Sequence, residues 1–178
     1  MNKTNRKIFS MHGGLFLDDH KSVSTSRPIE TAPIPPILII PVTQHIGSAA
    51  KPCVSIGDKV LKNQCIAKAD GRISARVHAS SSGTVIAIKQ HSTPHPSNLN
   101  VECIIIETDG RDIAAKPQNH PVSHYQSLSS SEIQQRIQDA GIVGLGGAGF
   151  PSHIKLNAGE HPVETLILNA AECEPYIS

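Results

Sequence analysis

The sequence lacks the features that most readily reveal a function: it has no CxxC pair, no long apolar run and almost no net charge. Its four cysteines, Cys53, Cys65, Cys103 and Cys173, lie too far apart to indicate a disulfide framework or a metal site, so reduced, buried thiols are expected. The formal charge of +1 gives no broad field that would attract nucleic acid or an acidic membrane surface. Any ligand must therefore be bound by a local group of residues and not attracted by the overall charge.

Membrane insertion and secretion are not indicated either. The longest apolar run, PPILIIPV at residues 35–42, is too short to span a bilayer and contains prolines. Near the start, cations precede some apolar residues, but His12 and two glycines interrupt that stretch and Asp18 and Asp19 end it, so no signal peptide is predicted. We expect a cytosolic chain without a transmembrane segment, attached to a membrane only through a partner.

Four regions follow from the distribution of residue types. Residues 1–36 are rich in Ser, Thr and Pro and are predicted to be an irregular lead-in. Residues 37–108 contain short β-branched stretches separated by turn residues, which predict a small all-β domain. Residues 109–127 are predicted to be a linker, and residues 128–178 to start an α/β domain. The fold class is therefore mixed, α+β.

A helix is predicted after the linker, because Ser129 and Glu132 have the spacing of a capping box. Ile133, Ile137 and Ala140 fall on one face of this helix, and Gly141 is a suitable left-handed stop. A second helix is expected around residues 152–158. The apolar run TLILNA at residues 165–170 is predicted to be a buried strand, which would be unpaired if the chain ended at Ser178.

The stretch from GDKV to SSSGTV resembles the biotinyl and lipoyl carrier domains, which form a barrel-sandwich hybrid of two related hairpins. Gly57 and Gly83 suit tight turns, and Asn63 stands where glycine is common. Carrier domains attach their cofactor to a lysine at the apex of the middle hairpin. Here residues 69–72 contain no lysine and Lys68 falls short of the apex, so the resemblance implies a docking module and not a carrier.

The most informative segment is GIVGLGGAGFPSHIK at residues 141–155. Its glycines leave a loop without bulky side chains, whose backbone N–H groups can converge on a phosphate. Pro151 is expected in the first turn of the following helix, whose amino end adds partial positive charge, and Lys155 supplies a full charge. The loop glycines are Gly144, Gly146, Gly147 and Gly149.

Two common nucleotide motifs do not explain this segment. Gly144, Gly146 and Gly149 satisfy GxGxxG, and Glu172 imitates its acidic partner, but the predicted helix stands where that fingerprint needs a strand. No GK[ST] follows, which excludes a P-loop. The pair His91 and His95 is the one histidine spacing that suggests a metal, and a polar loop explains it more simply.

A better match is the glycine loop of the NADH-oxidising flavin subunit of respiratory complex I, which reads GRGGAGFPT where this sequence has GLGGAGFPS. The two also share the pattern N-A-x-E-x-E-P, here from Asn169 to Pro175. Leu145 in place of the arginine, together with PVTQHIG at residues 41–47, is similar to the amino-terminal part of the RnfC-like subunit of the Rnf-type ion-translocating electron transport complex.

That resemblance implies a site for FMN and NADH and no catalytic or metal-binding side chain in this chain. Lys155 would contact the phosphate side of the flavin, Asn169 would hydrogen-bond the flavin, and the two glutamates would lie near the nicotinamide or its ribose. Cys173 would pack near the flavin. The residues implied are Gly144, Gly146, Gly147, Ala148, Gly149, Phe150, Lys155, Asn169, Glu172 and Glu174.

The implied function is an NADH-side subunit of a membrane-bound oxidoreductase and translocase, in which electrons pass between NADH, FMN and iron-sulfur centres or ferredoxin. Its partners would be the other members of the complex, and its place the cytoplasmic side of the bacterial inner membrane, as a peripheral protein. The CxxCxxCxxxCP motifs that hold the family's 4Fe-4S clusters are absent, so we expect an inactive fragment or a disrupted reading frame. The alternative is a non-catalytic docking fragment whose barrel binds other subunits.

Overall fold

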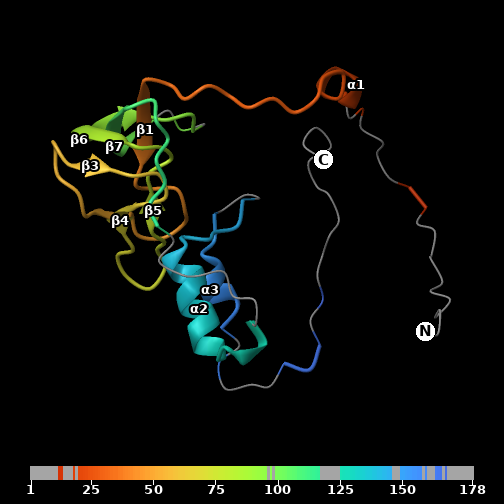
Figure 1. Cartoon of the computed structure of the whole chain (residues 1–178). Helices are drawn as coiled ribbons and strands as arrows, with labels where there is room; N and C mark the ends of the chain where they lie inside the picture. The colour runs from red at the N-terminus through yellow and green to blue at the C-terminus, as the bar shows by residue number, and fades with distance from the viewer. Residues whose placement is uncertain are drawn as a thin grey trace. The chain divides into compact units, whose positions relative to one another are not determined.

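The computed structural model describes residues 12–13, 18, 20–95, 97, 99–116, 125–145, 149–157, 159, 163–165 and 167. It divides into two units, Pro33–Val163 and a second that combines Met1–Ala32 with Glu164–Ser178. In the second unit, the predicted irregular lead-in contains one helical turn, α1 (Lys21–Ser24). The larger unit carries all the strands and the remaining helices of the described residues (Figure 1).

In the described part of the larger unit, seven strands form two antiparallel sheets (Figure 1). One sheet has the order β1-β7-β6-β3 and the other the order β2-β4-β5. The strands are β1 (Ile37–Pro41), β2 (Lys51–Pro52), β3 (Lys59–Val60), β4 (Cys65–Lys68), β5 (Val77–His78), β6 (Gly83–Ser92) and β7 (Asn100–Thr108). These strands, hereafter the barrel, confirm the predicted small all-β domain. Residues 53–56 and 73–76, expected in strands, lie outside them.

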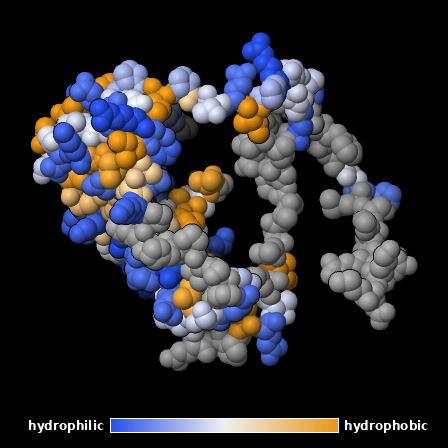
Figure 2. All heavy atoms as spheres, in the orientation of Figure 1, coloured by the Kyte–Doolittle hydropathy of each residue, from blue (hydrophilic) through white to orange (hydrophobic). Residues whose placement is uncertain are grey.

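A single hydrophobic core joins the two sheets. Ile104 and Ile106 of β7 are fully buried, as is Ile66 of β4 in the other sheet. Because these residues belong to one buried cluster, the inner faces of the sheets must face each other. On the side shown in Figure 2, hydrophobic and hydrophilic residues are interspersed over the surface of the barrel.

Three positions in the barrel test the predicted turn chemistry. Gly57 has a φ of 94°, as expected for a tight turn, and Asn63 has a φ of 66°, in the left-handed region that asparagine tolerates. The explanation for Gly83 is wrong, because this residue begins β6 without a positive φ. A Cβ there would collide with the backbone of Glu107, so glycine is required by the close approach of β7.

The first part of the predicted linker is attached to the barrel. Ala114 forms a parallel bridge with Lys62, and the backbone N–H of Ile113 donates to Ser82 Oγ at 2.8 Å. Ser82 Oγ in turn donates to Asp109 Oδ1 at 2.7 Å. Hydrogen bonds from the Arg111 backbone and from Ser82 hold the pKa of Asp109 below its usual value. The described residues just after β7 therefore add to the edge of the barrel.

The helical part begins with η1 (Tyr125–Ser127), followed by α2 (Ser130–Asp139) and α3 (Ser152–Lys155). The predicted capping box is confirmed: Glu132 N donates to Ser129 Oγ at 3.3 Å and Ser129 N donates to Glu132 Oε2 at 2.8 Å. Gly141 has the expected left-handed φ, 66°. None of the described helices is long and apolar enough to cross a membrane.

Two predicted elements lie near the end of the chain, a second helix and a buried strand. The second helix exists, but it has four residues, and Pro151 is its N-cap and not part of its first turn. A helix of one turn adds little dipole to an anion site. The strand predicted at residues 165–170 cannot be assessed as a whole, since only Thr165 and Ile167 lie within the described residues, and neither is in a strand.

Candidate functional site

The glycine segment is closed at its base by backbone contacts. Val143 and Pro151 form an antiparallel bridge, and Gly144 N donates to the carbonyl oxygen of Phe150 at 2.9 Å. Ser152 N donates to the carbonyl oxygen of Ile142 at 3.0 Å. These bonds bring the two ends of the loop together just before α3. Of the predicted loop residues, Gly146, Gly147 and Ala148 lie outside the described residues, as do Asn169, Glu172 and Glu174.

The described glycines of the segment have different physical roles. Gly149 has a φ of 60°, and a Cβ there would lie 3.0 Å from both the Gln44 carbonyl oxygen and His45 Cα. Gly141 likewise faces the backbone carbonyl of Arg76, with no room for a Cβ. Around Gly144, by contrast, the nearest atoms are those of Phe150 at 3.8 Å. Gly141 and Gly149 therefore let the segment lie against the barrel, whereas a Cβ at Gly144 would meet the described residues only at ordinary contact distance.

The barrel surface that Gly149 contacts is the loop after β1, residues 43–46. His45 holds this loop in place, because its Nε2 accepts a hydrogen bond from Ala75 N at 3.1 Å. The ring proton is therefore assigned to Nδ1, which donates to the Ile46 carbonyl oxygen at 3.1 Å. Ser48 N also donates to the Ile73 carbonyl oxygen at 3.0 Å. The motif PVTQHIG thus contains a loop that is hydrogen-bonded, through His45, to the connection between β4 and β5.

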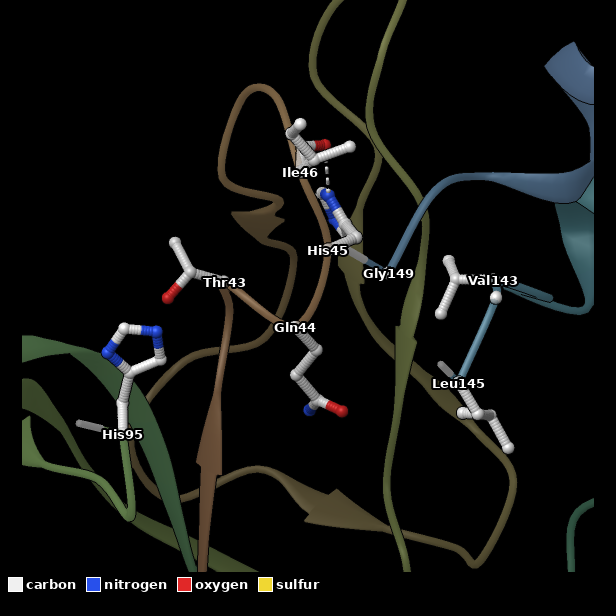
Figure 3. Close-up of a pocket in the computed structure, with 9 residues that line it drawn as sticks. Thr43, Gln44, His45, Ile46, His95, Val143, Leu145 and Gly149 are labelled. Carbon is white, nitrogen blue, oxygen red and sulfur yellow. Dashed lines mark hydrogen bonds between the residues drawn. The ribbon is translucent and has the colours of Figure 1, made fainter. Parts of the chain in front are cut away.

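A cleft of about 500 Å³ lies between this loop and the glycine segment (Figure 3). Its walls come from the loop after β1, the connection between β6 and β7, and the start of the glycine segment. The cleft is lined by Thr43, Gln44, His45, Ile46, His95, Val143, Gly144, Leu145 and Gly149. Sequence reasoning found the glycines but missed the barrel residues, because nothing in the local sequence shows that residues 43–46 meet the segment a hundred positions later.

Lys155 and Phe150, two further predicted site residues, lie near the cleft in sequence but do not line it. Lys155 is exposed in α3, and Phe150 is 37% exposed. A second cleft, of about 340 Å³, is lined by Arg72, Gln134, His153, Ile154, Asn157 and Gly159. Burial lowers the pKa of His153 in this region. The structure thus brings Gly144 and Gly149 together in one cleft and places Lys155 outside both.

The apex of the middle hairpin bears on the resemblance to carrier domains. Lys68 lies in β4, and Asp70 at the apex forms an exposed ion pair with Lys51, with 3.1 Å between Lys51 Nζ and Asp70 Oδ2. Asp70 N also donates to Ser74 Oγ at 3.0 Å. Arg72 lines the second cleft.

The described residues hold no group of three or more side chains that could ligate a metal ion. His91 and His95 therefore belong to no such group among these residues.

The two facing sheets are those of a barrel-sandwich hybrid, and the described residues that follow them form a capped helix and the base of a glycine loop. Comparison with known families agrees: residues 9–111 match the RnfC barrel sandwich hybrid domain and residues 137–178 match the Nuo51 FMN-binding domain. The first match covers more than half of the chain. The chain therefore belongs to the RnfC family.

Similar curated proteins are named as the C subunit of an ion-translocating oxidoreductase complex. The protein from Serratia proteamaculans (strain 568) is 49% identical over 172 residues, which make up 97% of this chain and 24% of that protein. The protein from Salmonella newport (strain SL254) is 45% identical over 172 residues, 97% of this chain and 23% of that protein. The chain thus spans about a quarter of the length of these relatives.

Proposed function

We propose that this chain forms the amino-terminal part of an NADH-side flavoprotein subunit of an ion-translocating electron transport complex. The observation that carries the proposal is the match of residues 137–178 to an FMN-binding domain, which follows the match of residues 9–111 to the RnfC barrel. The name of the curated relatives supports it. Bound FMN would supply the chemistry that links the two-electron donor NADH to one-electron acceptors such as iron-sulfur centres or ferredoxin.

The described residues fit part of an FMN site. The base of the glycine loop is fixed by the hydrogen bond between Gly144 and Phe150. Lys155 is exposed and supplies a positive charge for the FMN phosphate. Because α3 has a single turn, that charge carries more of the phosphate binding than the helix dipole does. Gly146, Gly147, Ala148, Asn169, Glu172 and Glu174 complete the proposed FMN and NADH site.

The remaining proposals concern the whole complex. The partners are the other subunits of the Rnf-type assembly, and the chain is placed as a peripheral protein on the cytoplasmic side of the inner membrane. The 4Fe-4S clusters belong to parts of the family whose ligand motifs this chain lacks. We therefore expect FMN binding, but no onward electron transfer to iron-sulfur centres, from the 178-residue chain.

The test is a titration of FMN fluorescence with the purified chain. Saturable quenching that weakens in Lys155→Ala, but not in the control Lys89→Ala on the barrel, is expected. Lys89 is also exposed, so the pair separates a local contact from a general effect of charge. The titration is repeated with a chain that continues past Ser178, as in the curated relatives. If neither chain quenches FMN, the flavin assignment is wrong.

A second candidate function is that of a non-catalytic docking module. The observation that favours it is the edge strand β1, whose Ile37 and Ile39 are 39% and 41% exposed. An exposed apolar edge is suited to pairing with another protein chain. The FMN titration separates the two functions, because a docking module folds, binds its partner subunits and does not quench FMN.

A further inference from the structure

Two cysteines of the barrel region lie beside each other although they are 12 positions apart in the sequence. Cys53 directly follows β2, and Cys65 begins β4, the strand with which β2 pairs. The backbone N–H of Cys53 donates to the carbonyl oxygen of Ile66 at 2.9 Å, and Cys53 Sγ lies 3.6 Å from the carbonyl oxygen of Cys65. The fold therefore brings together two thiols that their spacing in the sequence does not connect.

The backbone spacing at this place fits a disulfide. Pro52 is opposite Ala67, so Cys53 and Ile66 are the next pair along the ladder, and Cys65 is one residue further. From a strand separation of about 4.8 Å and a rise of about 3.3 Å per residue, the Cα atoms of the two cysteines are about 6 Å apart. Disulfides usually join Cα atoms about 4.4–6.8 Å apart.

An irregularity in β4 lets the two thiols share one side. In a regular strand, neighbouring positions alternate between faces, so Cys53 and Cys65 would point in opposite directions. Here the register shifts between Cys65 and Ala67, and Ile66 and Ala67 are buried one after the other. Cys53 is exposed and Cys65 is half-buried, whereas Cys103 is fully buried. The expectation of buried thiols is therefore wrong for Cys53, which a small reagent can reach.

The two thiols differ in reactivity in the way that stepwise disulfide exchange needs. Burial, and then the neighbouring Cys53, raise the pKa of the Cys65 thiol. Because the thiolate is the nucleophile, Cys65 attacks more slowly at neutral pH than an unshifted thiol does. The exposed Cys53 is therefore the thiol that meets an external disulfide first, and Cys65 is the thiol that resolves the mixed disulfide.

We propose that Cys53 and Cys65 form a reversible thiol–disulfide site that exchanges with low-molecular-weight disulfides. The Cys53 thiolate attacks the small disulfide, forms a mixed disulfide and releases one thiolate. Cys65 then loses its proton and attacks Cys53 Sγ, which releases the second thiolate. The net reaction oxidises two protein thiols to one disulfide and reduces one small disulfide to two thiols, which take up the two protons. Excess small thiol reverses it.

The disulfide has a structural consequence, because β2 is a short strand at the edge of its sheet. Pro52, one of its two residues, has no backbone N–H to donate to the neighbouring strand. A covalent link from Cys53 to Cys65 would fasten this edge to β4 and close the chain segment that contains β3. The site does not involve the proposed flavin function, so its test can fail while that function stands.

The experiment equilibrates the purified 178-residue chain with mixtures of reduced and oxidised glutathione. Remaining thiols are then blocked, and the chain is digested with trypsin and analysed by mass spectrometry. Because Lys59 and Lys62 lie between the two cysteines, trypsin separates them, and a linked peptide pair identifies the disulfide. A pair joined through Cys53 and Cys65 is expected.

Variants show whether the link is specific. The linked pair should be absent from Cys53→Ala and Cys65→Ala and should form normally in the matched controls Cys103→Ala and Cys173→Ala. Cys65→Ala should instead accumulate the glutathione adduct of Cys53, because the resolving thiol is missing. If the wild-type chain gives only glutathione adducts, or links other cysteines, the inference is overturned.

A second measurement shows whether the fold positions the pair, and it needs no variant. The glutathione ratio that gives half conversion is measured for the folded chain and for the chain unfolded in urea. Because a fold that holds two thiols side by side favours their disulfide, the equilibrium constant is expected to be about tenfold or more larger in the folded chain. By linkage, the oxidised chain should also need more urea to unfold than the reduced chain. Equal constants in the two states would overturn the inference even if the linked peptides form.

Discussion

Arg76, just before β5, forms an ion pair with Asp139 at the end of α2, with 2.6 Å between Arg76 Nη2 and Asp139 Oδ1. The exposed fractions of the two side chains are 30% and 25%. The ring of His78, in β5, also lies at this end of the helix, with its Cε1 3.2 Å from where a Cβ on Gly141 would be. Together with the close approach of Gly141 to Arg76, these contacts hold the end of the capped helix against the barrel.

The first prediction concerns this ion pair. Asp139→Asn is expected to weaken the docking of α2 by about 1–2 kcal/mol, because the pair is partly shielded from water and its partner Arg76 would be left uncompensated. Amide hydrogen exchange in α2 should become faster while exchange in β6 and β7 stays unchanged. The control is Lys51→Gln, whose ion pair with Asp70 has side chains 73% and 43% exposed and should contribute little. Equal effects of both changes would contradict the prediction.

The second prediction separates two costs at Gly149. Gly149→Ala forces a side chain into a left-handed conformation and against the backbone of Gln44, whereas Gly159→Ala meets a φ of 65° in open space. The shared conformational cost is about 1 kcal/mol, and the contact adds to it only at Gly149. Chemical denaturation should therefore show a larger loss of stability for Gly149→Ala. It should also disturb NMR signals of residues 43–46, which Gly159→Ala leaves unchanged.

Features encoded by neighbouring residues could be predicted from the sequence. The capping box at Ser129 and Glu132 depends on residues three positions apart, and the left-handed stop at Gly141 follows it directly. The strands rich in isoleucine could also be predicted, and in the structure β1 places Ile40 in the core while β7 places Ile104 and Ile106 there. In these places local chemistry and the final fold favour the same conformation.

Features that depend on distant contacts could not be predicted. Gly83 was assigned to a turn, but it is required by the backbone of Glu107 on the neighbouring strand. Gly149 fits a phosphate loop by sequence, yet the structure shows the barrel loop against it. Residues 53–56 and 73–76 have strand-like sequences but lie outside the ladders, since pairing depends on partners that a single sequence does not reveal.

The third prediction concerns pH. Burial, and then the positive charge of Arg76, lower the pKa of His78 below its ordinary value of 6.5. As the pH falls, His78 therefore becomes protonated at a higher pH in the unfolded chain than in the folded chain. The contribution of neutral His78 to the free energy of unfolding should be fully present above pH 6.5. It should be lost as the pH falls from 6.5 through the lower pKa of His78 in the folded chain.

The measurement is the midpoint of chemical denaturation between about pH 5 and 8, a range above the titration of ordinary carboxylates. His78→Gln should be less sensitive to pH than the wild-type chain. His153, whose pKa burial also lowers, should contribute in the same direction, so the double variant should be flatter still. A single variant with an unchanged pH profile would exclude His78 as a source of the effect.

The fourth prediction tests the reassigned role of Gly83. A Cβ at this position would collide with the backbone of Glu107 and lie 2.9 Å from Cγ2 of Ile106, a fully buried residue of the barrel core. Since backbone must move to make room, Gly83→Ala is expected to destabilise the barrel by about 3 kcal/mol. Gly57→Ala has only its φ of 94° to overcome, with nothing within 4 Å, and should cost about 1–2 kcal/mol.

Urea denaturation followed by circular dichroism measures both variants against the wild-type chain. If glycine were needed at position 83 for turn geometry, as the sequence suggested, the two substitutions would have similar costs. A clearly larger loss for Gly83→Ala, with an unchanged slope of free energy against urea, would show that strand-to-strand distance decides the residue. The approach of β6 to β7, and not the turn before β6, would then be what fixes this position of the barrel.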